Sequence, residues 1–358
     1  MNKFILSFLA VSLLFSCKDD EKKDVDTGYK IPTTYNFDNV SFGGQTSRLD
    51  MLENITTYIK TGATVGTSLD AQQIKDMFAN SGNPFNDLAL DTSGKKLSNK
   101  CFILDTALFI SYFDSLEIIA GTTGGSNGVA GIVTNGTKSY LCNAKGFEYA
   151  QLIDKGLMGA VFYYQACENY FTDAKIGDAV DNITVTPGKG TPREHHFDEA
   201  FGYFGVPTDF PSNTNGIRFW GKYCDGRDGM LNSNQLMMDA WLKGRAAISN
   251  NDKVAMDAAV VDIKALWEKI SVGTALHYLN GAIDNINDDA ERNHELSEAV
   301  AFIGALKYNS NAVITTVEIA QILAAIGDNF YEVSISDLNN AKTLLAGFYG
   351  FDAQKNQF

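Results

Sequence analysis

Residues 195–205 read HHFDEAFGYFG, and residues 294–304 read HELSEAVAFIG. The two stretches align without a gap: each has a histidine, then Glu-Ala four and five residues later, then a small, an aromatic and an apolar residue before a glycine. A second matching pair precedes them in the same order: residues 159–164 read GAVFYY, and residues 273–278 read GTALHY. Two pieces repeated in the same order indicate an internal duplication, whereas chance similarity between amphipathic helices is the alternative.

The spacing of apolar residues predicts helices through most of the chain. Apolar residues recur three and four positions apart, which places them on one face of a helix. The clearest patterns cover residues 48–58, 148–171, 195–205, 233–248, 252–286, 290–308, 316–326 and 337–347. Only six prolines occur in 358 residues, which agrees with a helical fold because proline interrupts helices.

Other segments carry strand, turn or cap signals. Residues 129–146 alternate apolar residues with Gly, Thr and Ser, which predicts a short hairpin. Ser68 is expected to cap the second helix, and residues 211–229 are expected to form a long aromatic-bearing loop. We therefore expect a mainly α fold with two duplicated helical bundles, residues 43–232 and 233–358, about a pseudo-twofold axis, and a short β-hairpin or irregular insertion.

The N-terminus has the features of a bacterial lipoprotein precursor. Lys3 gives a positive start, residues 4–15 are almost entirely apolar, and the run ends in Ser16-Cys17. About a dozen apolar residues are too few for a membrane-spanning helix, which needs about twenty, so we interpret residues 1–16 as a cleaved signal peptide. Cys17 would then carry the lipid, with several acyl chains for stable anchoring. A buried N-terminal helix is the alternative.

A charged segment follows this cysteine. Residues 18–24 read KDDEKKD and cannot bury apolar surface, so residues 17–42 are expected to form a flexible tether. Lysine followed by acids directly after the cysteine also resembles the surface-export signal of Bacteroidetes lipoproteins, and a generic spacer is the alternative. We therefore expect a lipid anchor in the outer membrane, with the protein at the cell surface or otherwise on the periplasmic face.

Composition excludes some classes of partner. The chain has 29 basic and 43 acidic residues, a net charge of −14 and a pI near 4.7. Nucleic acids and anionic membrane surfaces attract basic patches, so neither is an expected partner. Besides Cys17 there are four cysteines: Cys101, Cys142, Cys167 and Cys224. In an envelope protein they can form one or two disulfides, or all four can be buried thiols, and the sequence does not decide between these alternatives.

Three of the four histidines lie in the repeated stretches. His195 and Glu199 are four residues apart and share a helix face, and so do His294 and Glu298. His196 lies three residues before Glu199 and is also its neighbour. Imidazole and carboxylate groups bind iron and zinc, so we predict that these five residues form a metal or ligand site between the bundles. The alternative is that each pair only stabilises its helix by a hydrogen bond.

Three stretches, together with the N-terminal segment, resemble one family. Residues 155–165 read KGLMGAVFYYQ, residues 194–207 read EHHFDEAFGYFGVP, and residues 218–223 read RFWGKY. They look like the Bacteroidetes lipoproteins called domain of unknown function 4856, from about residue 29 to the C-terminus. Members of that family resemble imelysin-like proteins of iron-acquisition systems.

Imelysins are duplicated helical bundles with a Gly-x-His-x-x-Glu motif. His196 and Glu199 match the His and Glu of that motif, whereas Glu194 stands at the glycine position. The resemblance implies an iron- or haem-related binding role at the outer membrane, with a TonB-dependent receptor and imelysin-like lipoproteins as partners.

We therefore expect a binding or accessory lipoprotein of metal uptake, with iron or zinc as the candidate metal. Two other classes stay open. One is a zinc peptidase in which the metal activates water, and the other is a structural or interaction lipoprotein without a ligand. Motifs of phosphate-binding loops, nucleophile elbows and His-Glu-x-x-His zinc helices do not occur in the sequence.

Overall fold

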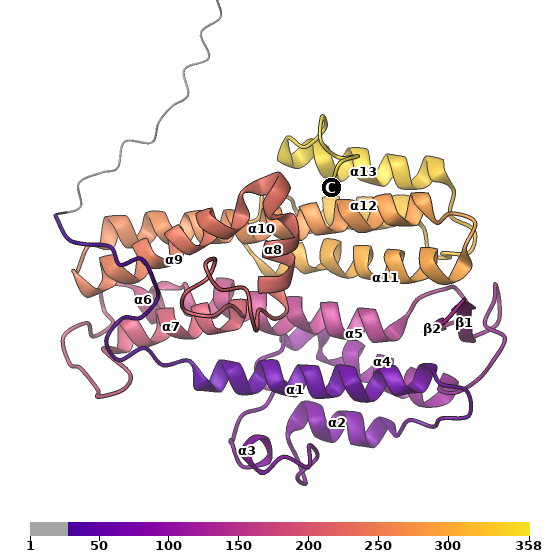
Figure 1. Ribbon diagram of the computed structural model, residues 1–358, viewed down its shortest axis with the longest axis horizontal. Helices are drawn as coiled ribbons and strands as arrows, with labels where there is room; N and C mark the ends of the chain where they lie inside the picture. The colour runs from indigo at the N-terminus through magenta and orange to yellow at the C-terminus, as the bar shows by residue number, and fades with distance from the viewer. Residues whose placement is uncertain (1–27) are drawn as a thin grey trace, which may run out of the picture. The chain divides into compact units, whose positions relative to one another are not determined.

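The computed structural model describes residues 28–358 (Figure 1). The predicted signal peptide, the lipidation site Cys17 and the first part of the predicted tether lie outside the described residues. Contacts between Cα atoms group residues 31–358 into one unit. Among the helices of the described part, none has the length and apolar character needed to cross a membrane.

Helices form most of this unit, as the sequence predicts. The α-helices are α1 (Gly43–Lys60), α2 (Ala71–Ala79), α3 (Leu88–Asp91), α4 (Thr106–Ile119), α5 (Tyr149–Leu157), α6 (Asp173–Ile176), α7 (Pro192–Phe204), α8 (Trp220–Leu231), α9 (Ser233–Ser249), α10 (Lys253–Asp284), α11 (Asp289–Ala305), α12 (Thr316–Ile326) and α13 (Ile335–Tyr349). Shorter 3-10 helices are η1 (Thr61–Ala63), η2 (Ile103–Asp105) and η5 (Leu306–Tyr308), and π-helices are η3 (Met158–Tyr163) and η4 (Ala166–Tyr170).

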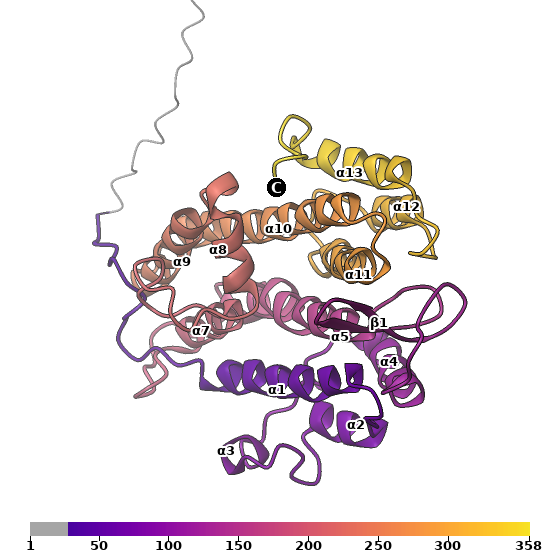
Figure 2. The same ribbon diagram turned by 45° about the vertical axis from the view of Figure 1, so that its right-hand side comes forward.

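The helices pack side by side in a definite order. α2 packs on α1, α1 on α5, α5 on α11, and α11 on both α10 and α12, while α13 packs on α10 and α12 (Figures 1 and 2). Short connections, residues 250–252 and 285–288, make antiparallel hairpins of α9 with α10 and of α10 with α11. α5 therefore lies between α1 and α11.

The helix predicted over residues 148–171 is present but changes its geometry. It runs as α5 to Leu157 and continues through η3 and η4 as π-helix. Gly159 of η3 allows close packing against Ala305 and Tyr308, because a Cβ at this position would lie 2.8 Å from the Ala305 Cβ and 3.0 Å from the Tyr308 ring. Insertions of π-helix are frequent at functional sites.

Three tryptophans form the aromatic centre of the core. Trp220 of α8, Trp241 of α9 and Trp267 of α10 are fully buried. The Trp267 ring centroid lies 5.8 Å from that of Trp220 and 6.3 Å from that of Trp241. These rings join helices on both sides of residue 232, where α8 and α9 also pack together. The division into bundles at residue 232 thus stays a prediction, while the mainly α class is confirmed.

The predicted hairpin is also confirmed. β1 (Gly131–Asn135) and β2 (Lys138–Cys142) pair antiparallel with Asn135 opposite Lys138. Gly136 begins the two-residue turn with φ 58, a value that glycine adopts readily. Both strands pack on α11.

Two local predictions are wrong. Asp70, not Ser68, caps α2, because its carboxylate accepts the backbone N–H groups of Gln72 and Gln73. The loop predicted over residues 211–229 contains most of α8, since buried contacts of Trp220 outweigh a local sequence rich in glycine and charge.

The packed unit also begins earlier than residue 43. Tyr35 lies in the predicted tether, yet it is fully buried and stacks on Phe201 of α7 with ring centroids 3.8 Å apart. Its hydroxyl donates a hydrogen bond to Asp198. The tether expected through residue 42 therefore ends before Tyr35.

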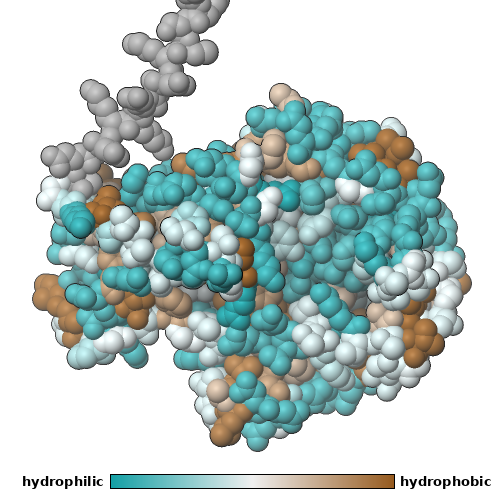
Figure 3. Space-filling model, viewed as in Figure 1, coloured by the Kyte–Doolittle hydropathy of each residue, from teal (hydrophilic) through white to brown (hydrophobic). Residues whose placement is uncertain are grey.

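The surface and the thiols complete the fold. Hydrophilic residues cover most of the face shown in Figure 3, with hydrophobic residues in separate small patches. The four cysteines of the described residues are all buried free thiols, so they form neither one nor two disulfides with each other: Cys101, Cys142, Cys167 and Cys224.

Candidate functional site

The first repeated stretch lies on α7, whose start is strongly specified by the sequence. Thr191 and Glu194 form a capping box, in which each side chain accepts the other residue's backbone N–H, and Pro192 occupies the first turn. Gly205 ends α7 in the left-handed conformation with φ 82. In the second stretch, by contrast, Gly304 remains inside α11.

Glu199 and His196 on α7 have protein partners, whereas in the described chain the Nδ1 of His195 is buried without one. Glu199 Oε1 accepts hydrogen bonds from Gln45 Nε2 at 2.9 Å and from the Tyr170 hydroxyl at 3.2 Å. His196 Nδ1 donates to the carbonyl of Lys175 at 2.7 Å. Burial is the main cause that lowers the pKa of His195, which favours its neutral form. These contacts join Glu199 and His196 to residues outside α7 and not to each other.

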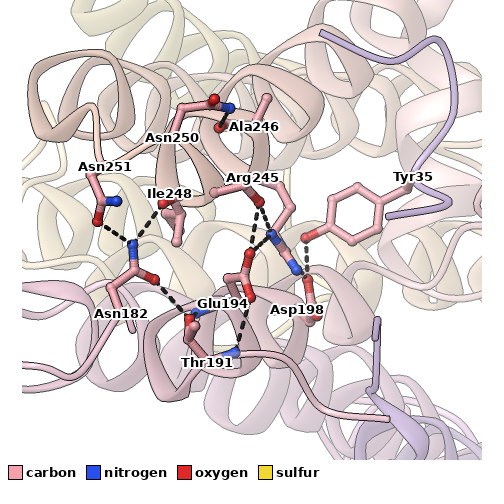
Figure 4. Close-up of polar contacts among 11 residues, drawn as sticks. Tyr35, Asn182, Thr191, Glu194, Asp198, Arg245, Ala246, Ile248, Asn250 and Asn251 are labelled. Carbon is pink, nitrogen blue, oxygen red and sulfur yellow. Dashed lines mark hydrogen bonds and ion pairs between the residues drawn. The ribbon is translucent and has the colours of Figure 1, made fainter. Parts of the chain in front are cut away.

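A neighbouring face of α7 carries a buried ionic network that sequence reasoning missed (Figure 4). Arg245 of α9 is 1 % exposed; its Nε donates to Asp198 at 2.8 Å and its Nη1 to Glu194 at 2.7 Å. Tyr35 donates to the same Asp198 oxygen at 3.0 Å. Burial raises the pKa of Asp198 to about 6, although Arg245 opposes this. The signal was the i, i+4 spacing of Glu194 and Asp198, which puts both on one helix face.

The second predicted pair lies on α11 in a denser polar cluster. His294 Nδ1 donates to Glu148 Oε2 at 2.6 Å, and its Nε2 lies 3.7 Å from Glu298 Oε1. The Tyr140 ring stacks on the imidazole with centroids 4.4 Å apart. Burial lowers the pKa of His294, but the hydrogen bond and charge of Glu148 outweigh it, so the net pKa is raised. The pair thus favours the imidazolium.

Glu298 connects this imidazole to residues on other helices. The Tyr223 hydroxyl donates to Glu298 Oε2 at 3.3 Å, and Lys155 Nζ lies 3.9 Å from Glu298 Oε1. Lys155 also pairs with Asp154 at 2.7 Å, and Thr56 donates to Asp154 at 3.0 Å. A continuous chain of polar contacts therefore runs from His294 to the side of α1.

The structure does not bring the two predicted pairs together. The helix that runs through α5, η3 and η4 separates them. His294 contacts Glu148 at the start of this central helix, whereas Glu199 contacts Tyr170 at its end. About 22 residues at 1.5 Å each place these two ends roughly 30 Å apart. In residues 28–358, no group of three or more His, Cys, Asp or Glu side chains has an arrangement that could hold a metal ion.

A different feature of the fold has the character of a ligand site. A cavity of about 620 Å³ lies where α4, α5, α11 and α12 meet. Its lining is mainly apolar or small: Leu108, Phe109, Tyr112, Phe147, Leu152, Gly156, Val300, Ala301, Gly304, Ala305, Leu323, Ala324 and Gly327. Small-molecule sites commonly have volumes of about 300–1,000 Å³ and apolar walls with few polar groups.

Most polar groups of this cavity already have protein partners. Tyr308 donates its hydroxyl to Asp105, and Lys307 Nζ pairs with Asp105 Oδ2 at 2.7 Å. Burial, followed by this hydrogen bond, raises the pKa of Tyr308. Asp328 also lines the cavity and pairs with Lys145 at 2.6 Å. The cavity thus has an apolar interior with a lysine and tyrosines at its edge.

Sequence reasoning missed this cavity because its walls come from four separate helices. The available signal was the excess of small residues on predicted helices, namely Gly156, Ala301 and Gly304. The long apolar stretch that begins at Leu104 gave a second signal, since Leu108 and Phe109 of this stretch line the cavity. Neither signal shows from sequence alone that these residues face a common space.

The chain matches a known protein family. The model of a family described as "Domain of unknown function (DUF4856)" matches residues 32–352. No curated protein and no solved structure matches the chain.

Proposed function

The chain belongs to the family of domain of unknown function DUF4856, and on that premise we propose that it is a binding lipoprotein of the cell envelope that holds a haem-type tetrapyrrole in the cavity between α4, α5, α11 and α12. The observation that carries this proposal is the cavity itself, with its volume of about 620 Å³ and its apolar lining.

The shape of the lining favours a flat, largely apolar ligand. Gly156 and Gly304 have no side chain, and Ala301 only a methyl group, so the helix backbones themselves form part of the wall. Phe109 and Tyr112 of α4 contribute aromatic rings beside it. An aromatic ligand can stack on such rings while it displaces water from apolar surface.

The chemistry of the lining favours a tetrapyrrole over a bare metal ion. Iron and zinc ions require several imidazole, carboxylate or thiolate ligands at once. The cavity lining instead offers phenols, one lysine and a single carboxylate, Asp328, which pairs with Lys145. Tyrosine is one of the residues that ligate haem iron, and Tyr112 lines the cavity. Lys307, with its side chain 33 % exposed, is placed to meet a ligand carboxylate.

A tetrapyrrole ligand agrees with the cellular role that the family resemblance implies. Lipidation at Cys17 would hold the protein on the outer membrane, at the cell surface or on the periplasmic face. From there it would act as a binding or accessory component of iron or haem acquisition and pass its ligand to a TonB-dependent receptor or an imelysin-like lipoprotein.

Gly304 offers a direct test of this proposal. A Cβ at Gly304 would meet nothing within 4 Å, and Gly304 lines the cavity, so we expect a leucine there to occupy cavity space. We expect haem to bind the chain that begins at residue 28 with a saturable change in its visible absorption, and we expect Gly304→Leu to weaken this binding at least tenfold.

The matched control is Gly347→Leu. Gly347 is an exposed glycine inside α13 that also has open space around its Cβ, so it repeats the helix and hydropathy change away from the cavity. Equal haem affinity of the two variants, or no saturable binding by the unchanged chain, would contradict the proposal. Circular dichroism checks that both variants fold.

A further inference from the structure

A second, polar cavity lies on the other side of α5. It has a volume of about 240 Å³ and lies between α1, the end of α5 and the start of α8. Thr56 and Thr57 of α1 line it with hydroxyl groups that donate to Asp154 and to the Glu53 carbonyl, while Met158 and Phe219 form its apolar wall. Its size suits a small molecule rather than a tetrapyrrole.

Four cationic side chains line this cavity: Lys60, Lys155, Arg218 and Lys222. This concentration is unusual for a chain in which 43 acidic residues outnumber 29 basic ones. Glu53 and Asp154 are the carboxylates of the lining. Four positive charges therefore face two negative ones within a single small space.

The two exposed lysines keep their charge available. Within residues 28–358, neither Lys60 nor Lys222 has a carboxylate within ion-pair distance, whereas Arg218 pairs with Asp50 and lies 3.5 Å from Glu53. Arg218 is thus fixed in place, and the lysines are free to close over a ligand.

Lys155 forms the inner wall. Its side chain is 11 % exposed, and its ammonium lies 5.6 Å from the centroid of the Tyr223 ring. Burial lowers the pKa of Lys155, but the charges of Asp154 and Glu298 outweigh burial and raise it, so the group stays cationic. Through Glu298 this lysine joins the polar cluster of His294.

The backbone at the start of α8 supports the same ligand class. No side chain caps the N-terminus of this twelve-residue helix; the backbone N–H groups of Gly221 and Lys222 donate to the carbonyls of Arg218 and Phe219. The positive end of the helix dipole therefore lies beside the lysines and favours negative charge.

We propose that the cavity between α1, α5 and α8 binds a small anion with a carboxylate or phosphate group, held by Lys60, Lys155 and Lys222. Phe219 and Met158 cover the less polar part of the ligand. This site is separate from the tetrapyrrole cavity, so either can exist without the other.

Calorimetric titration with citrate and with inorganic phosphate tests the proposal. We expect at least one of the two to bind saturably with one site per chain, and more weakly as the salt concentration rises. Binding of phosphate alone identifies a phosphate ligand, and binding of citrate alone identifies a carboxylate ligand. Absence of saturation by both would overturn the proposal.

Substitutions locate the site. We expect the double variant Lys60→Gln with Lys222→Gln to weaken anion binding at least tenfold and to leave haem affinity unchanged. Lys243→Gln is the matched control, because Lys243 is an exposed lysine on α9 outside the cavity. If Lys243→Gln weakens binding as much as the double variant, the cavity is not the site. Gly304→Leu should leave anion binding intact, which separates this proposal from the previous one.

Discussion

Replacement of Glu295 by glutamine should stabilise the protein at alkaline pH. Glu295 lies on α11, and in the described chain its Oε2 is buried without a hydrogen-bond partner. Burial raises the pKa of Glu295 from 4.5 to about 7, and the charges of Glu298 and Glu291 add to this while His294 opposes it. An acid with a raised pKa keeps its proton in the folded state between these two values and loses it in the unfolded state.

The sign of the pH effect follows from proton linkage. Because the folded state binds more protons between pH 4.5 and 7, this group makes the free energy of unfolding fall as the pH rises through that window. The difference between the two pKa values corresponds to about 3 kcal/mol. Glu295 is only partly buried, and solvent screening reduces this to about 1–2 kcal/mol. Glutamine has nearly the same shape and no charge, so it removes this cost.

Urea denaturation at pH 5 and pH 8 measures the effect. We expect Glu295→Gln to raise the free energy of unfolding by about 1–2 kcal/mol at pH 8 and to change it little at pH 5, where most of the carboxyl is already protonated. Glu117→Gln, at an exposed position of α4, repeats the charge change and should have no such effect. A variant that is no more stable at pH 8, or equally stabilised at both pH values, would refute the reasoning.

Two further predictions concern the polar clusters. Arg245→Met leaves Asp198 buried without its cation and should lower the free energy of unfolding by about 3–5 kcal/mol. Urea denaturation measures this loss, with Lys243→Met as the control. A loss below about 1 kcal/mol would mean that the network contributes little. Glu148→Gln removes the main group that raises the pKa of His294, although Glu298 and Glu295 still face it. In the unchanged protein the pKa of His294 should lie above 6.5, and the stability that this pair contributes should be lost as the pH rises through that pKa. NMR titration of the imidazole should show a lower pKa of His294 in the variant. An unchanged pKa would argue against the hydrogen bond.

The fit between sequence and structure differs between elements for a physical reason. The long helix α10 and the hairpin β1–β2 are visible in the sequence because side-chain period and turn residues act over a few positions. The start of α8 was missed because its local sequence favours a loop. It is helical because Trp220 is buried against Trp267 and donates its indole N–H to the carbonyl of Met158.

The candidate sites show the same division more sharply. The sequence placed His195, His196 and Glu199 on one helix and His294 and Glu298 on another, and that placement is confirmed. Their expected meeting between bundles required a relation between distant segments, and the central helix instead holds the two groups at its opposite ends.

By itself, the sequence determined the helical class, the hairpin, the acidic surface and the helix faces on which the histidines and glutamates lie, since these depend on neighbours within one or two turns. Only the tertiary structure decided which partners those side chains have, and it alone formed the apolar and cationic cavities. Each cavity wall combines residues more than 100 positions apart, and no local pattern specifies which helix faces will share a common space.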